Sequence, residues 1–204
     1  LTGGLIAPFQ GFWVKANAEN PELTINKSAK TTGGEYYGKS KRDPASIGFE
    51  LTADSLTAET YITLSPDGKQ ANDRRDAYRL LPFNTDTYLE FYSTLNDGTQ
   101  LDINNLARSF GKEISIPIHV GGFKNGAPLN GEYTISWPDF GDVPEAWTLI
   151  LEDKQTGQQV NLRKNTFYSF NLSQQKSKTA VQDTVQDFQL TPTPKLQQSK
   201  AKSS

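Results

Sequence analysis

IAPFQGFWVKA, residues 6–16, is the stretch around which we expect the rest of the chain to be organised, because it gathers three aromatic side chains around one glycine. Pro8 excludes the interior of a helix, and Gly11 indicates a bulge or the close approach of another backbone. Phe12 and Val14 alternate with polar or outward neighbours as the two faces of a strand require. The stretch therefore predicts a core strand, and nothing in it points to a chemical reaction.

Length and composition favour an all-β domain. The chain has 204 residues, a size that a single β-sandwich can reach. Hydrophobic residues make up only 35%, but the aromatic share of 11% compensates because each ring buries a large area. We expect residues 1–190 to form the sandwich module, as one unit or as two small sub-sandwiches, and residues 191–204 to be a flexible linker containing Lys, Ser and Pro.

The charge balance and the missing residue types exclude several classes of site and partner. Lys and Arg number 21 against 23 Asp and Glu, so the net charge of −2 provides no field that would attract nucleic acid. Cysteine is absent, which removes disulfides, thiolate nucleophiles and thiolate zinc sites. Methionine is also absent, even at position 1, which indicates a piece of a longer protein. No run approaches the about 20 apolar residues of a membrane-spanning helix, so we expect no membrane insertion.

Alternation of apolar and polar residues predicts about ten to twelve short strands. Their regular spacing is typical of an antiparallel β-sandwich with two sheets, for which a jelly roll is one candidate arrangement. Residues 23–25 are expected to return as the hairpin partner of the opening strand. The inward positions of the strands give the expected core, which comprises Phe12, Val14, Phe49, Leu51, Ile62, Leu89, Phe91, Ile116, Ile118, Ile135, Leu149, Leu151 and Phe170.

Turn residues separate these strands. Pro66-Asp67-Gly68 and Asn96-Asp97-Gly98 are typical turn sequences, and the second predicts a hairpin. Residues 152–157 are expected to form another hairpin connection, with Gly157 in the left-handed conformation. Pro117 interrupts the donors of the strand through residues 114–120, which predicts an edge position or a bulge.

The most charged segment, residues 73–80, contains two aspartates and three arginines. These side chains could form a ligand site, but a local ion-pair network that anchors the loop is the favoured interpretation.

The sequence marks out no catalytic group, so we expect a protein that is not an enzyme and that needs no cofactor or metal. The single histidine, His119, lies on the outward phase of a strand and is expected at the surface rather than as a general base. No Gly-x-Ser-x-Gly elbow is present. A glycosidase needs only two carboxylates, which leaves a glycan-active enzyme as a weak alternative. Calcium at Asp67, Asp97 or the loop 139–142 is a further weak alternative, since such turns form without metal.

Four short motifs, taken in order, resemble one family. They are PFQGFWVKA within residues 6–17, DAYRL at 76–80, LILED at 149–153 followed by Thr-Gly at 156–157, and FYSF at 167–170. This series resembles the β-rich module that precedes the C-terminal sorting domain in cargo proteins of the type IX secretion system of Bacteroidetes.

The resemblance implies a non-catalytic accessory module of a secreted or cell-surface multidomain protein. Its implied partners are the neighbouring domains of the same polypeptide or the secretion machinery. Asp187-Phe188-Gln189-Leu190 only approximates the RFxL ending of the family, and the tail holds no recognisable sorting signal. The sorting domain has therefore either been removed or lies outside this chain.

The alternative function is carbohydrate binding. Sandwich domains attached to secreted enzymes often bind glycans, although this argument rests on fold-level analogy. Tyr36, Tyr37 and Trp137 are the candidate ligand-binding residues because each lies in or beside a long loop, where a ring can stack on a sugar.

Overall fold

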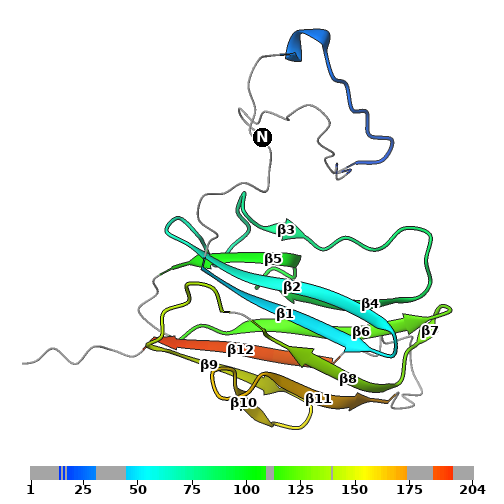
Figure 1. The fold of residues 1–204 in the computed structure, drawn as a ribbon. Helices are drawn as coiled ribbons and strands as arrows, with labels where there is room; N and C mark the ends of the chain where they lie inside the picture. Colours follow the sequence, from blue (N-terminus) through cyan, green and yellow to red (C-terminus); the bar gives the residue numbers. More distant parts are fainter. Residues whose placement is uncertain are drawn as a thin grey trace, which may run out of the picture. The chain divides into compact units, whose positions relative to one another are not determined.

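The computed structural model describes residues 14, 16, 18–30, 45–108, 113–138, 140–173 and 186–194. The chain forms two compact units, Leu1–Asp43 and Pro44–Ser204, and every described strand belongs to the second (Figure 1). The expected module of residues 1–190 therefore spans the first unit and most of the second. The described strands of the second unit share one sheet.

The described residues of the first unit do not form strands. A single 3-10 turn, η1 (Lys27–Ala29), interrupts an otherwise irregular backbone. Val14 is 57% exposed, and Leu23 and Ile25 are exposed as well, so the predicted core position of Val14 and the predicted strand 23–25 are wrong. Two apolar side chains among polar neighbours bury too little area to offset the ordering of a strand. Phe12 and most of residues 6–16 lie outside the described residues.

The described part of the second unit is built of strands and contains no α-helix. The strands are β1 (Ala45–Ala53), β2 (Leu56–Ser65), β3 (Ala77–Tyr78), β4 (Tyr88–Thr94), β5 (Gln100–Ala107), β6 (Ile116–Lys124), β7 (Ala127–Pro128), β8 (Gly131–Ser136), β9 (Trp147–Asp153), β10 (Gln159–Asn161), β11 (Phe167–Leu172) and β12 (Gln186–Pro194). The predicted all-β, sandwich-like fold is confirmed.

These strands form one continuous sheet that folds over into two layers, instead of two separate sheets. Their order is β10-β9-β12-β6-β4-β5-β2-β1-β8-β11, with β3 attached to β5 and β7 to β6 (Figure 1). All pairs are antiparallel except β2 and β5, which run parallel. The parallel pair arises because residues 66–99 form a long crossover that returns the chain in its original direction.

The two ends of the sheet meet face to face. The Phe170 ring on β11 lies 4.9 Å from the Phe188 ring on β12, although seven steps of the strand order separate these two strands. Tyr168, also on β11, donates its hydroxyl to Asp153 on β9 at 2.9 Å. The contacts of β11 with β12 and β9 therefore close the sandwich.

 Along the sheet, β6, β4, β5, β2, β1 and β8 lie between β12 and β11, so this contact is made across the layers and not between hydrogen-bonded neighbours.

The predicted core is largely confirmed. The predicted residues that are buried are Phe49, Leu51, Ile62, Phe91, Ile116, Ile118, Ile135, Leu149, Leu151 and Phe170. Leu89 is only partly buried, although it packs against the core. The hairpin of β1 and β2 shows why the prediction works, since β1 alternates buried and half-buried residues along its whole length. A half-covered strand keeps the period of two that the sequence displays.

The C-terminal strand is longer than predicted. Residues 191–194, expected to belong to the linker, continue β12 and pair with β9. The Pro192 carbonyl accepts a hydrogen bond from the Ile114 N–H, so the backbone polar groups of Pro192 face away from β9. Its missing N–H therefore removes no bond to β9. The predicted start of the linker at residue 191 rested on the proline content of this segment, but residues 191–194 belong to β12.

Pro117 is accommodated at the end of an inner strand, which differs from the predicted edge strand or bulge. β6 lies between β12 and β4, but its pairing with β4 begins only at Ile118. Pro117 pairs only with Gln189 of β12. Because no residue of β4 pairs with Pro117, the missing N–H of proline removes no hydrogen bond to β4.

The predicted turns are present, but at one of them glycine is required for a different reason than a positive φ. Gly98 and Gly157 have positive φ values of 84° and 73°, as expected. Gly68 instead provides space, because a Cβ atom there would lie 2.1 Å from the Leu106 carbonyl oxygen.

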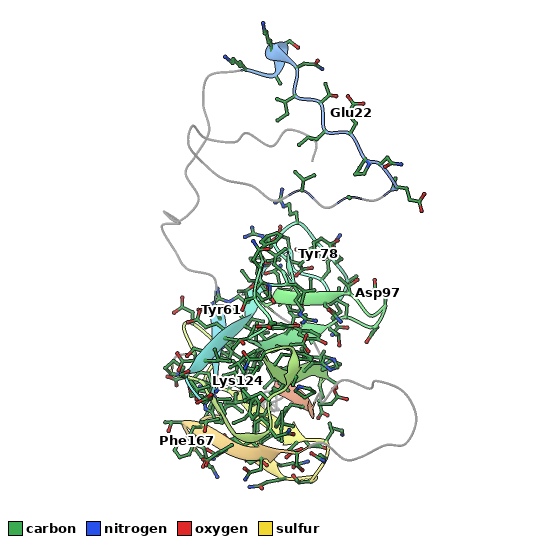
Figure 2. All side chains as sticks on the ribbon, turned by 90° about the vertical axis from the view of Figure 1, so that its right-hand side faces the viewer. Glu22, Tyr61, Tyr78, Asp97, Lys124 and Phe167 are labelled. Atoms are coloured by element: carbon green, nitrogen blue, oxygen red, sulfur yellow. The ribbon has the colours of Figure 1, made fainter. Side chains whose placement is uncertain are left out.

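The core assignment predicts the effect of truncating Phe91, which is buried on β4. Phe91→Ala should lower the free energy of unfolding by about 3–5 kcal/mol, because it removes buried apolar area and leaves a cavity. Urea or guanidinium unfolding measures the change. Phe167→Ala is the matched control, since the Phe167 ring on β11 is 59% exposed (Figure 2). Equal stability of the Phe91 variant and the parent would contradict the assignment.

Tyr133 on β8 is a fully buried phenol. Its hydroxyl donates to the Leu129 carbonyl at 2.7 Å, and its ring stacks on Phe170. Burial raises the pKa of Tyr133 to about 12. The folded protein therefore retains a proton that the unfolded chain loses near pH 10.

This pKa shift predicts a loss of stability at alkaline pH. The contribution of Tyr133 is complete below about pH 10 and falls as the pH rises toward 12, because the unfolded state then binds fewer protons. Tyr133→Phe should make the free energy of unfolding less dependent on pH in this interval, while lowering it by about 1 kcal/mol at neutral pH through the lost hydrogen bond. Denaturant unfolding at pH 8 to 12 measures both effects. An identical pH slope in the variant would refute the assignment.

Candidate functional site

A line of polar side chains crosses the outer face of β12, β6 and β4. The register places Asp187 opposite His119, and His119 opposite Tyr92. Directly opposite residues on antiparallel strands point to the same face, so these three side chains lie side by side. The line extends to three more residues, and we call the set Asp187, His119, Tyr92, Thr94, Arg79 and Glu90 the polar row.

His119 is bonded at both ring nitrogens. Its Nδ1 lies 2.5 Å from Asp187 Oδ1, and its Nε2 lies 3.0 Å from Thr94 Oγ1. The ring also stacks on Tyr92, with 5.1 Å between the ring centroids. The predicted outward phase of His119 is confirmed, but its side chain is mostly covered by these neighbours and is not a plain surface residue.

Arg79 forms the other half of the polar row. Its guanidinium carbon lies 4.2 Å from the centroid of the Tyr92 ring, a cation–π contact. It also forms an ion pair with Glu90, and its Nη1 donates to Gln100 Oε1 at 2.9 Å. Glu90 is only 9% exposed although it lies on the outward phase of β4, because Arg79 and its loop cover it.

The charged loop before β3 is held by its aspartates. Asp76 accepts hydrogen bonds from the Asp73 and Asn105 backbone N–H groups, both at 2.7 Å. Asp73 accepts from the Arg75 N–H at 2.7 Å and from Asn105 Nδ2 at 3.1 Å. Burial raises the pKa of Asp76. The loop is anchored as predicted, but its two aspartates do this through bonds to backbone N–H groups and Asn105, while its arginines pair with Asp67 and Glu90 outside the segment.

Thr94, His119 and Asp187 are connected as a hydroxyl nucleophile, a base and an orienting carboxylate are in hydrolases. Acyl transfer also needs donors for the oxyanion, commonly the N–H of the residue after the nucleophile. Here that group, the Leu95 N–H, already donates to the Thr99 carbonyl at 2.9 Å within the β4–β5 hairpin. The three side chains therefore hold neighbouring strands together without providing this oxyanion donor.

The described part of the chain contains no cluster of side chains that could bind a metal ion. There, no group of three or more His, Asp or Glu side chains is placed to hold one ion. Asp97, one of the considered calcium ligands, accepts a hydrogen bond from the Thr99 N–H at 3.0 Å, which lowers the pKa of its carboxyl.

The predicted sugar platform does not form around Trp137. This residue is 2% exposed, and its indole N–H donates to the carbonyls of Leu162 and Asn165 at 2.9 and 2.7 Å. Trp137 keeps the inward phase of Tyr133 on β8, so its ring enters the core instead of the neighbouring loop. The prediction of Trp137 as a ligand-binding residue is wrong, and Tyr36 and Tyr37 lie outside the described residues.

Sequence reasoning missed the polar row as a unit. The outward phases of Glu90, Tyr92 and His119 were readable from the alternation. The pairing of β4 with β6 and of β6 with β12 brings them to Asp187, and the pairing of β3 with β5 brings Arg79 to them. Such pairing over long sequence separations has no local signal in one sequence.

Comparison with known proteins found no match to this chain among protein-family models, curated proteins or solved structures. Within the described residues, no helix has the length and apolar character needed to cross a membrane.

The polar row predicts unequal effects of removing two carboxylates. Glu90→Gln should lower the free energy of unfolding by about 3–5 kcal/mol, because it leaves the largely buried Arg79 charge without its partner. Asp54→Asn is the matched control, since the ion pair of Asp54 with Lys124 is half exposed and should contribute only about 0–1 kcal/mol. Denaturant unfolding compares the two variants, and equal losses would show that the Arg79–Glu90 pair behaves as a surface pair.

Proposed function

We propose that the chain is a non-catalytic accessory β-sandwich module of a secreted or cell-surface multidomain protein. The observation that carries this proposal is the use of the family-like motif residues. Asp153 of LILED accepts hydrogen bonds from the Gln155 N–H and the Tyr168 hydroxyl, both at 2.9 Å. Tyr168 belongs to the FYSF motif, so two separate motifs meet in a contact that closes the fold.

The DAYRL motif is used in the same way. Asp76 fixes the loop before β3 through backbone N–H groups, and the Leu80 N–H donates to Asp102 Oδ2 at 3.2 Å. The polar atoms of this motif bind backbone N–H groups and other residues of the fold, which supports a structural role for the motif. This agrees with the type IX cargo resemblance, which remains part of the proposal.

An exposed apolar strip supports contact with a neighbouring domain of the same polypeptide. Leu80, Leu81 and Phe83 are all exposed, and they follow Arg79, whose pairing with Glu90 fixes the start of the strip. Contiguous exposed apolar surface is typical of protein–protein contacts.

The accessory role predicts that the purified chain does not turn over substrates. Nitrophenyl esters and nitrophenyl glycosides should be hydrolysed no faster than in buffer, because Thr94 lacks the oxyanion donor of a hydrolase. Thr94→Val and His119→Ala serve as controls and should give the same background rate. Turnover by the parent that disappears in folded Thr94→Val would overturn the non-catalytic assignment.

The context of the module is tested on the natural polypeptide. Mass spectrometry of culture medium and cell-surface fractions should find this sequence within a longer chain that carries an effector domain before it and a sorting domain after it. Its recovery only from the cytoplasm, without such neighbours, would contradict the accessory role.

A further inference from the structure

Strand β11 forms one end of the sheet and has an open backbone edge. Among the described strands it pairs only with β8, and Figure 1 shows it at the lower margin of the β-rich unit. Its register with β8 is continuous from Phe167 to Leu172, without a bulge. The edge away from β8 therefore has the regular geometry that accepts a further strand.

The backbone groups that face this edge follow from one hydrogen bond. The Trp137 N–H donates to the Thr166 carbonyl at 3.3 Å, so these two residues form a hydrogen-bonded pair just before β11. In an antiparallel ladder such pairs alternate with pairs that do not bond each other. Phe167, Ser169 and Asn171 therefore direct their N–H and C=O groups away from β8, and these groups form no backbone bond to another described residue.

The side chains of the same three residues are exposed on the outer face of β11. Phe167 is 59% exposed, and Ser169 and Asn171 are exposed as well. Figure 2 shows the Phe167 side chain at the margin of the β-rich unit. The Ser169 hydroxyl lies 2.8 Å from Thr134 Oγ1, which ties β11 to β8 on this face. A strand added at the edge would therefore cover the Phe167 ring.

β11 lacks the features that protect the edges of natural sheets. Such edges are short, charged, interrupted by proline or bent by a bulge. The six residues of β11, FYSFNL, include no Asp, Glu, Lys, Arg, Pro or Gly, and three of them are aromatic. The strand at the other end, β10, has only three residues, while β3 and β7 have two each and β7 contains Pro128. β11 is therefore the unprotected edge within the described part of the sheet.

The sequence of β11 is compatible with pairing to itself. A two-fold axis at Ser169 would place Ser169 opposite its own copy and Phe167 opposite Asn171 of the second copy, all through the edge-facing groups. Each of these pairs would exchange two N–H···O bonds. Because β11 is uncharged, no like charges would meet, and the two serine hydroxyls could bond each other. Uncharged segments of this length with high β-propensity are the ones that pair with identical copies.

We propose that β11 is an interface through which two copies of the chain join edge to edge and continue the sheet across a two-fold axis. A foreign strand finds no charge on β11 that would select it, whereas an identical strand brings the matching length and a second Phe167 ring to cover. Symmetric pairing uses both β11 edges, so it gives a closed dimer and no fibre. The proposal goes beyond the accessory role, which holds for a monomer as well.

Sedimentation velocity of the full chain tests this dimer. The parent should change from monomer to dimer as its concentration rises from the low to the high micromolar range. Ser169→Pro should weaken dimerisation by at least about tenfold, because it removes the N–H that each copy donates across the axis. The ladder with β8 should remain, since proline is tolerated where the N–H of an edge strand faces solvent. Circular dichroism and thermal unfolding check that the variant is folded.

A charged variant provides a second test that does not depend on proline. Ser169→Lys places two like charges opposite each other, so it should weaken the dimer by about threefold or more at low salt and recover at high salt. Thr134→Lys is the matched control, because it adds the same charge and removes the same hydrogen bond between Thr134 and Ser169. It lies on β8, one strand further from the axis, and should dimerise as the parent does.

Amide hydrogen exchange locates the interface. The N–H groups of Phe167, Ser169 and Asn171 should exchange more slowly at high than at low protein concentration, because they become hydrogen-bonded in the dimer. The exposed strip at residues 80–83 should exchange equally at both concentrations.

A parent that stays monomeric throughout the concentration range would overturn the proposal, and so would polymers larger than a dimer. Unchanged dimerisation in either folded Ser169 variant, or protection that appears only at residues 80–83, would overturn it as well. None of these results alters the hydrolysis assay or the location of the polypeptide, so failure of this inference can be distinguished from failure of the accessory role.

Discussion

The contact of β11 with β12 and β9 is the interaction on which the sandwich depends. A twelve-stranded hydrogen-bonded sheet could remain open, with one apolar face in water. Phe170 and Tyr168 pack on Phe188, and the Tyr168 hydroxyl reaches the buried carboxylate of Asp153. Apolar burial supplies most of the driving force, and the hydrogen bond fixes which residues meet.

The outer face of the β12, β6 and β4 layer is organised by charge and ring stacking. His119 links Asp187 to Thr94, and Arg79 spans from the Tyr92 ring to Glu90. These bonds give the outward positions of inner strands a second, polar layer of packing. They also connect the charged loop before β3 to the sheet.

The carboxylates of Asp153 and Asp76 and the amide of Asn104 differ in how their polar atoms are satisfied. Asp153 and Asp76 bond to backbone N–H groups and serve the fold, which fits an accessory module. Asn104 instead leaves a buried oxygen unpaired beside a polar cavity.

The sequence by itself determined the all-β class, most of the core and the turns, because strand alternation and turn chemistry depend on residues close together in the chain. Phe49, Ile62 and Gly157 were assigned correctly for that reason. The tertiary structure alone decided that β2 and β5 run parallel and that His119 meets Asp187. These outcomes depend on which distant strands pair and which layer covers them, and one sequence carries no local signal for that choice.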